Sequence, residues 1–291
     1  MSDIYNLFIF GMGFSSKAIA ARSQSDFASI IGTSRSTEKV EALERAGFDG
    51  TQFDGVMTDE VANALMDATH LLISIAPGEA DPVLPLLADI KSQCPKLVWI
   101  GYLSTVGVYG NHDGEWVDEE TELRPVSKRS KERVAAEAAW QELAENAGIP
   151  LGIFRLSGIY GPGRNAFKTI EKDNSRRLVK PGQVFNRIHV ADIGKAVALS
   201  MRGNIGGIFN ITDDLPAPPQ DVVTYAHELM GKEPPQEIDF ETADLTPMAR
   251  SFYGENKRVS NARSKDILGM DYEWPNYEQS LRRMWEESLW Q

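Results

Sequence analysis

Residues 7–20 read Leu7-Phe8-Ile9-Phe10-Gly11-Met12-Gly13-Phe14-Ser15-Ser16-Lys17-Ala18-Ile19-Ala20, and this stretch decides the fold that we expect. Its first four residues form an apolar run of strand length, and its last four begin a helical segment. The turn between them follows the pattern G-x-G-x-x-G, with a serine in place of the third glycine. In this pattern the first glycine permits a tight turn and the second lets a phosphate approach the backbone. The third lets helix and strand pack closely.

The start of the predicted helix is suited to a phosphate-bearing ligand. Free N–H groups and the positive end of the helix dipole favour an anion at this position. We therefore predict a dinucleotide whose pyrophosphate contacts the residues of this turn, namely Gly11, Gly13, Phe14, Ser15 and Ser16.

The residues that end the second predicted strand bear on which dinucleotide is bound. They are Thr33, Ser34, Arg35 and Ser36, and no acid is among them. NAD sites usually place Asp or Glu here for the ribose 2′-hydroxyl, whereas NADP sites use Arg for the 2′-phosphate. The sequence thus favours NADP over NAD, with Thr33, Ser34 and Arg35 as phosphate ligands. By position in the chain, further cofactor contacts are expected at Asp54, Ala76, Pro77 and Leu156.

The composition argues against several classes of protein. The chain has 291 residues, enough for one large α/β domain or for a domain with a smaller lobe. Its net charge of −12 does not suit a nucleic-acid partner. No apolar run approaches the roughly 18–20 residues that cross a bilayer, and the first residues lack the basic start of a signal peptide. With a lone cysteine, Cys94, and four scattered histidines, we expect a cytoplasmic protein without a disulfide or a metal site.

Strand and helix signals alternate over the first half of the chain. Apolar runs occur at residues 7–10, 29–32, 71–75, 97–100, 151–156 and 208–211, and helical periods at 16–22, 38–46, 59–67, 82–91 and 128–147. This alternation predicts an α/β fold of Rossmann type, a doubly wound parallel sheet with helices on both faces. Gly-Pro and Pro-Pro breaks after about residue 156 indicate a smaller C-terminal substrate lobe. We predict a dinucleotide-binding domain from residues 1–156 and 186–212, and the substrate lobe from residues 157–185 and 213–291.

Five further motifs follow one another along the chain. They are Ser104-Thr105-Val106-Gly107-Val108-Tyr109-Gly110, Arg155-Leu156-Ser157-Gly158-Ile159-Tyr160-Gly161-Pro162-Gly163-Arg164, Ile188-His189-Val190-Ala191-Asp192, Gly207-Ile208-Phe209-Asn210-Ile211 and Val259-Ser260-Asn261-Ala262-Arg263. Together they resemble the extended short-chain dehydrogenase/reductase superfamily, and specifically an atypical branch of its nucleotide-sugar epimerase/dehydratase group. The resemblance covers nearly the whole chain.

The resemblance implies catalytic roles and exposes one departure from the family. Thr105 corresponds to the Ser/Thr that hydrogen-bonds the substrate oxygen, and Lys131 to the lysine that holds the nicotinamide ribose. The family's tyrosine stands four residues before that lysine, where this chain has Ser127. An aliphatic hydroxyl is a much weaker acid than a phenol, so Ser127 alone would be a poor general acid or base. Either Tyr109 substitutes for the phenol, or the chemistry differs, or the protein binds NADP without turnover.

One segment of the chain has a net charge opposite in sign to that of the whole chain. Residues 161–190 carry seven basic side chains against two acids. Such a reversal can concentrate an anionic ligand, although a solvated helix and loop would have the same composition. In the resembled family this region contacts the substrate, which is often a nucleotide sugar. We therefore expect a small, anionic hydroxyl or carbonyl substrate.

Two functions remain open from the sequence. One is an NADP-preferring oxidoreductase or epimerase, and the other is a catalytically impaired NADP-binding module that regulates a protein partner. By the same resemblance, the alanine-rich segment 133–147 would pair with its twin in a homodimer. Packing of this segment on its own sheet would account for the same residues.

Overall fold

The computed structural model describes residues 5–291. Residues 1–4, part of the N-terminal segment in which no signal-peptide pattern was found, lie outside the described residues. The main sheet is parallel, with seven strands in the order β3-β2-β1-β4-β5-β7-β11. Such a sheet buries both faces, which agrees with the continuous apolar runs of its central strands. The strands are β1 (Asn6–Phe10), β2 (Ser29–Ser34), β3 (Asp49–Gln52), β4 (His70–Ile73), β5 (Trp99–Thr105), β7 (Leu151–Leu156) and β11 (Gly207–Ile211).

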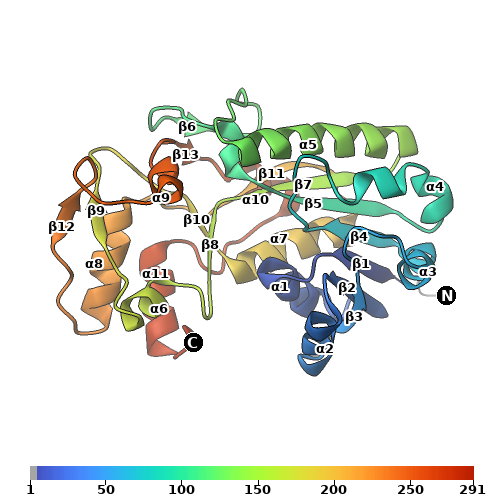
Figure 1. Ribbon diagram of the computed structural model, residues 1–291, viewed down its shortest axis with the longest axis horizontal. Coiled ribbons are helices and arrows are strands. Elements are labelled where there is room, and N and C mark those ends of the chain that lie inside the picture. The colour runs from blue at the N-terminus through green and yellow to red at the C-terminus, as the bar shows by residue number, and fades with distance from the viewer. Residues whose placement is uncertain (1–4) are drawn as a thin grey trace.

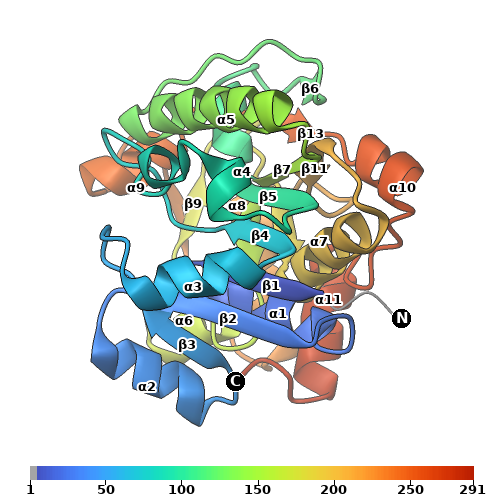
Figure 2. The ribbon, with the colours of Figure 1, turned by 90° about the vertical axis from the view of Figure 1, so that its right-hand side faces the viewer.

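Helices cover both faces of this sheet (Figures 1 and 2). One face packs against α1 (Phe14–Ser23), α2 (Thr37–Arg45), α7 (Val190–Gly203) and α10 (Ala262–Leu268). The other face packs against α3 (Asp59–Asp67), α4 (Ile90–Gln93) and α5 (Lys128–Ala147). This arrangement confirms the predicted doubly wound sheet of Rossmann type.

Most predicted elements lie near their expected places, although β3 is not among the apolar runs, the bounds of β4 and β5 differ from those expected, and one helix is wrong. The bounds of α3, α5 and β7 are those expected from the sequence. The single helix expected at residues 82–91 is wrong, because a 3₁₀ turn, η1 (Leu84–Leu87), and the short helix α4 occupy this segment. Pro85 lies inside the expected helix, and a proline there supplies no N–H group for a helical hydrogen bond.

The remaining elements build a smaller region at one end of the sheet, on the left in Figure 1. Its core includes Phe167, Ala226 and Leu281. Three small parallel sheets pair β8 with β10, β9 with β12 and β6 with β13. The elements are η2 (Val106–Tyr109), β6 (Trp116–Val117), β8 (Gly158–Tyr160), α6 (Ala166–Glu171), β9 (Arg177–Val179), β10 (Arg187–His189), α8 (Pro219–Leu229), β12 (Glu237–Asp239), α9 (Pro247–Phe252), β13 (Arg258–Val259) and α11 (Tyr277–Glu286).

The division of the chain into two parts stays a prediction. One segment assigned to the substrate lobe packs elsewhere, because Leu268, Met270 and Tyr272 belong to the core beneath the main sheet. Helix α10 and the residues that follow it thus pack on the Rossmann core.

Candidate dinucleotide and substrate site

The glycine turn after β1 is shaped by Gly11. Its φ of +93° lies in the region that favours glycine, and an added Cβ would come within 2.9 Å of the Ile75 side chain. The Gly11 N–H donates to Thr33 Oγ1 at 2.8 Å, and the Met12 N–H donates to the Thr33 carbonyl at 2.8 Å. Thr33 therefore holds the turn. Its buried, bonded hydroxyl argues against the predicted contact of Thr33 with a 2′-phosphate.

The start of α1 leaves room for a ligand. Gly13 precedes the first helical residue, Phe14, and an added Cβ at Gly13 would meet no atom within 4 Å. The first amides of an α-helix lack helical acceptors, so they can donate to an anion. Ser15 is half-buried and the Ser16 side chain is fully buried, so Ser16 offers a ligand only its backbone N–H. The turn thus fits the predicted pyrophosphate.

The end of β2 presents an exposed cation beside α2. Arg35 is exposed, and within residues 5–291 its guanidinium makes no ion pair or side-chain hydrogen bond. Its carbonyl accepts a bond of 3.3 Å from Gln52 Nε2. Ser34 is half-buried, and its carbonyl accepts from the Phe53 N–H at 2.8 Å, which brings the exposed Asp54 to the same strand end.

A cavity of about 1380 Å³ lies beyond the carboxyl ends of β4, β5 and β7. Ligands of doubly wound folds bind at this edge of the sheet. The cavity exceeds the ~300–1,000 Å³ of usual small-molecule pockets, so it has room for the nicotinamide half of a dinucleotide and a substrate. The predicted residues that line it are Ala76, Pro77, Thr105, Ser127 and Leu156.

Two hydroxyl groups of this cavity already have local partners. Thr105 Oγ1 accepts from the Gly107 N–H at 3.1 Å, as the cap of η2. Ser127 caps α5, where its Oγ accepts from the Ser130 N–H at 3.1 Å and lies 2.9 Å from Ser130 Oγ. Both oxygens keep further hydrogen-bonding capacity toward the cavity.

The cationic residue that α5 turns toward the sheet is Arg133, not Lys131. Lys131 is exposed and is not among the residues that line the cavity. Arg133 lines it, and its Nη1 donates to the Leu103 carbonyl and to Tyr102 Oη. The predicted role of Lys131 in holding a ribose therefore does not fit its place in the fold. Two residues along a helix turn a side chain through about 200°, so helix phase separates the two cations.

Helix phase could have revealed Arg133 in the sequence. Ser130, Glu137 and Trp140 lie on the buried face of α5, and Arg133 shares that face at spacings of three, four and seven residues. The motif spacing Y-x-x-x-K pointed instead to Ser127 and Lys131. Position 129, four residues before Arg133, holds another arginine that lines the cavity, Arg129.

Tyr109 does not face the cavity. Its side chain is fully buried, its hydroxyl donates to Asn210 Oδ1 at 2.7 Å, and it accepts from Arg155 Nη1 at 2.9 Å. Burial raises the pKa of Tyr109 to about 12. The hypothesis that Tyr109 replaces the catalytic phenol is contradicted by this position, since a proton donor must reach the substrate.

Tyr109 belongs instead to a buried polar network beneath Thr105. Arg155 on β7 forms a bidentate pair with Glu137 on α5, with Nη2 to Oε2 at 2.8 Å, and both side chains are 3% exposed. Ser104 on β5 donates to the same carboxylate. This network joins α5, β5 and β7, and it includes Ser104, the residue next to Thr105.

Most of the basic residues in segment 161–190 are neutralised or directed away from the cavity. Lys168 pairs with Glu171 at 2.6 Å, and Arg177 pairs with Glu237 at 2.7 Å. Of the seven basic residues in this segment, Arg164 and Arg187 line the cavity. The expected basic surface is thus reduced to two guanidinium groups.

Asp213, next to the carboxyl end of β11, is a buried acid in this region. Its side chain is 2% exposed, its Oδ1 accepts from the Leu215 N–H at 3.2 Å, and its Oδ2 has no hydrogen-bond partner. Burial raises the pKa of Asp213 to about 8, against the opposing effects of the Leu215 N–H and Arg187. Near neutral pH this carboxyl therefore carries a proton.

Residues 5–291 lack the features of two other classes of site. No group of three His, Cys, Asp or Glu side chains within this range is arranged to hold a metal ion. No helix within it combines the length and apolar character needed to cross a membrane.

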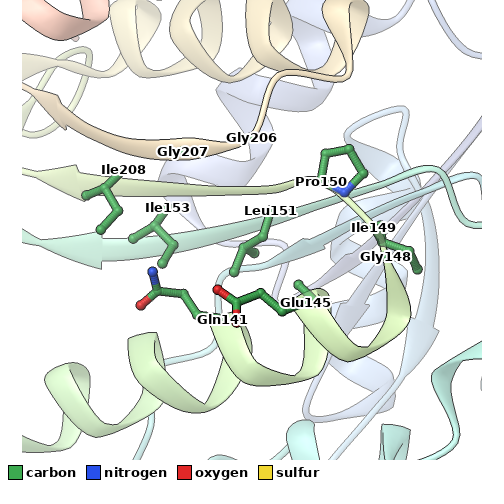
Figure 3. A pocket seen from close by; sticks show the side chains of 11 residues that line it. Gln141, Glu145, Gly148, Ile149, Pro150, Leu151, Ile153, Gly206, Gly207 and Ile208 are labelled. Atoms are coloured by element: carbon green, nitrogen blue, oxygen red, sulfur yellow. The ribbon is translucent and has the colours of Figure 1, made fainter.

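A second cavity of about 420 Å³ lies between the end of α5 and the first residues of β7 and β11 (Figure 3). It opens at the amino ends of the strands, away from the edge where Rossmann folds bind ligands.

Part of the chain matches a known protein family. The model of the NAD dependent epimerase/dehydratase family matches residues 83–212. Residues 83–212 therefore belong to this family, as the motifs in this segment predicted.

Among its relatives, a functionally unknown conserved protein from Silicibacter pomeroyi has a solved structure with 45% identity and a TM-score of 0.89, covering 97% of this chain and 99% of that one. Protein YeeZ of Escherichia coli K12 is 26% identical over 92% of this chain and 96% of its own length. UDP-glucuronic acid 4-epimerase from Bacillus cereus, solved in complex with NAD, is 17% identical with a TM-score of 0.74 over 97% of both chains. At that identity the last comparison supports the fold alone.

Removal of the Glu137 carboxylate tests the network under the cavity. We expect Glu137→Ala to lower the free energy of unfolding by about 3–5 kcal/mol, because Arg155 is left buried without its counter-ion. Joint replacement by Glu137→Met and Arg155→Met should recover much of that loss, since no unpaired charge remains. Urea unfolding followed by circular dichroism measures both, and a loss below about 1 kcal/mol for the single variant contradicts the network.

The buried carboxyl of Asp213 predicts a pH dependence of stability. With a folded pKa near 8 and an unfolded pKa near 3.9, the native state alone holds this proton between those values. Stability from this group is therefore lost as pH rises from about 4 to 8, by up to about 1.4 kcal/mol per pH unit. Asp213→Asn should flatten the profile between pH 5 and 8 in urea unfolding. An identical slope in the variant would show that Asp213 is already ionised.

Proposed function

We propose that this protein is an NADP-preferring oxidoreductase or epimerase acting on a small, anionic hydroxyl or carbonyl substrate. One observation carries the proposal. The open amino end of α1 and the cavity lined by Thr105 lie on the same edge of the sheet, where a dinucleotide and a substrate would meet. A nicotinamide dinucleotide, when bound, supplies a centre that exchanges hydride with a carbon of the substrate.

The residues of the chain fit this cofactor. The amides at the start of α1 and the open space above Gly13 suit the pyrophosphate, and the exposed Arg35 suits a 2′-phosphate. Ala76, Pro77 and Leu156 line the cavity that would hold the nicotinamide half. Arg133, held by the carbonyl of Leu103, provides the fixed cation on the α5 side.

Thr105 is the residue proposed to orient the substrate oxygen. It is half-buried at the end of β5, and its hydroxyl lines the cavity. A hydroxyl can donate one hydrogen bond and accept others, so Thr105 can bind a carbonyl or a hydroxyl oxygen while capping η2. The two phenols that line the cavity, Tyr160 and Tyr253, come from the smaller region.

A second candidate is an NADP-binding module that does not turn over. The observation that favours it concerns the two candidate proton donors: Ser127, at the expected tyrosine position, is a helix cap, and Tyr109 is buried in its own network. Stopped-flow absorbance of protein-bound NADPH against a panel of aldehydes and ketones separates the two. Oxidation of NADPH by any of them supports the enzyme, and tight binding without oxidation supports the module.

Filling the space above Gly13 tests cofactor binding. Gly13→Val should raise the Kd for NADPH at least about tenfold, because the side chain would occupy the volume assigned to the pyrophosphate. The fold should be unaffected, since φ at Gly13 is −92° and an added Cβ meets no protein atom within 4 Å. Calorimetry gives the affinity and circular dichroism the fold. Gly78→Ala, at another uncrowded glycine, is the control. Equal affinity of wild type and Gly13→Val would contradict this binding mode.

The choice of NADP over NAD depends on Arg35. Arg35→Ala should weaken NADPH binding about 10–100-fold, which corresponds to loss of charge-assisted hydrogen bonds of about 1.5–3 kcal/mol, while NADH binding hardly changes. Lys39→Ala removes an equal charge from the exposed face of α2 and serves as the control. Similar losses for both coenzymes in Arg35→Ala would defeat the preference for NADP.

A further inference from the structure

Arg187 stands out among the residues that line the cavity, because it is a cation held in place by backbone carbonyls. It opens β10, which pairs with β8. Its Nη1 donates to the Phe185 carbonyl at 2.9 Å and to the Ala217 carbonyl at 3.1 Å. These two bonds fix the plane of the guanidinium group. A side chain fixed in this way loses little further conformational entropy when it binds a ligand.

The other nitrogens of this guanidinium have no hydrogen-bond partner within residues 5–291. Arg187 lines the cavity, and within residues 5–291 no carboxylate lies within 4.0 Å of it. Its Nε and Nη2 make no hydrogen bond to the described residues and are not among the fully buried polar atoms, so they keep some accessible surface. Burial lowers the pKa of Arg187, which shows that its charge is poorly solvated. An anion with two acceptor oxygens would compensate this charge through a bidentate contact.

The surroundings of Arg187 do not neutralise it. The acids and phenols whose charges act on it are Asp213, Tyr160, Tyr277 and Tyr253. With a pKa raised to about 8, mainly by burial, Asp213 is protonated near neutral pH. Burial also raises the pKa of Tyr160, so this phenol is neutral as well. Tyr160 Oη and Asp213 Oδ2 have no hydrogen-bond partners, which leaves unsatisfied polar groups around the same cation.

We propose that Arg187 binds a single carboxylate of the substrate, so that the protein acts on carboxylic acids. This inference rests on the proposed function and names the substrate class of that site. The carbon body of the acid would contact the apolar side chains that line the cavity near Arg187, such as Phe185, Val222 and Leu281.

The charges of the cavity favour a carboxylate over a diphosphate. A diphosphate carries more than one negative charge and calls for several free cations. Lys257 already pairs with Glu255 at 2.8 Å and donates to the Gly110 carbonyl at 2.7 Å. The Arg164 guanidinium lies 5.8 Å from the centre of the Phe14 ring, on the α1 side of the site. The other lining cations, Lys128, Arg129 and Arg133, come from α5. Among the lining cations of the smaller region, Arg187 is the one that neither pairs with a carboxylate nor lies over an aromatic ring.

Calorimetry on the NADPH-saturated protein tests this assignment with two matched pairs of probes. Phenylpyruvate is compared with phenylacetone, which lacks the carboxylate, and glucuronate is compared with glucose. UDP is the diphosphate probe. The variants are Arg187→Met, Arg187→Lys and, as a control for charge on an exposed part of the same segment, Lys172→Met.

We expect at least one of the two acids to bind the wild type at least about tenfold more tightly than its uncharged partner. Arg187→Met should remove that difference, Arg187→Lys should keep part of it, and Lys172→Met should leave it unchanged. NADPH affinity should be the same in all four proteins. In the wild type, the Nε–H resonance of Arg187 should shift when the acid is added, which gives a readout that does not depend on the folding of a variant.

Three results would overturn the proposal. The first is that neither acid binds more tightly than its uncharged partner. The second is that Arg187→Met leaves the difference in affinity intact. The third is that substitution of Arg187 changes the affinity for UDP but not for either acid. Failure of the proposed function is distinguished from these results by the first titration, because a wild-type protein that does not bind NADPH fails before any acid is added.

Discussion

The direction in which α1 leaves β1 is the constraint on which the rest of the site depends. Gly11 adopts a φ of +93° where a side chain would overlap Ile75, and Thr33 holds the turn through its hydroxyl and its carbonyl. This geometry points the free amides of α1 at the edge where the parallel strands end. Without it, the first amides of α1 would not lie at this edge, beside the cavity beyond β5 and β7, to bind the pyrophosphate.

The wall of the cavity opposite this turn depends on a buried charge pair. Glu137 and Arg155 join α5 to β7, and Ser104 and Tyr109 complete the network below Thr105. A buried ion pair is weak evidence for added stability, but breaking one leaves an uncompensated charge in the core. The pair therefore locks α5 in one rotation over the sheet. That rotation presents Arg133 to the cavity and Lys131 to solvent.

The fold was accessible from the sequence because local signals agree with one another. The run of residues 7–10, the glycine turn and the alternation of strands and helices each predict the sheet that the structure contains. The helix at residues 128–147 has the same bounds in the structure because Ser127 caps it and Gly148 ends it in the left-handed conformation. The segment at residues 82–91 was harder, because apolar residues at helical spacing masked the effect of Pro85.

Only part of the candidate site could be predicted from the sequence, for a physical reason. Motif spacing places residues along the chain, but burial and helix phase decide which of them reach the cavity. Ser127 and Thr105 reach it, whereas Tyr109 turns into the core and Lys131 turns outward. The neutralisation of Lys168 and Arg177 by Glu171 and Glu237 depends on tertiary pairing that composition alone does not reveal. Helix phase could have pointed to Arg133, whereas Arg187 became recognisable only from its carbonyl partners in the structure.

The most direct test of this binding mode is a crystal structure of the protein crystallised with NADPH. The account predicts electron density for the pyrophosphate over Gly13, within hydrogen-bonding distance of the first amides of α1, with the nicotinamide directed into the cavity that Thr105 lines. A dinucleotide bound elsewhere on the molecule, or a cavity edge without one at saturating NADPH, would contradict it.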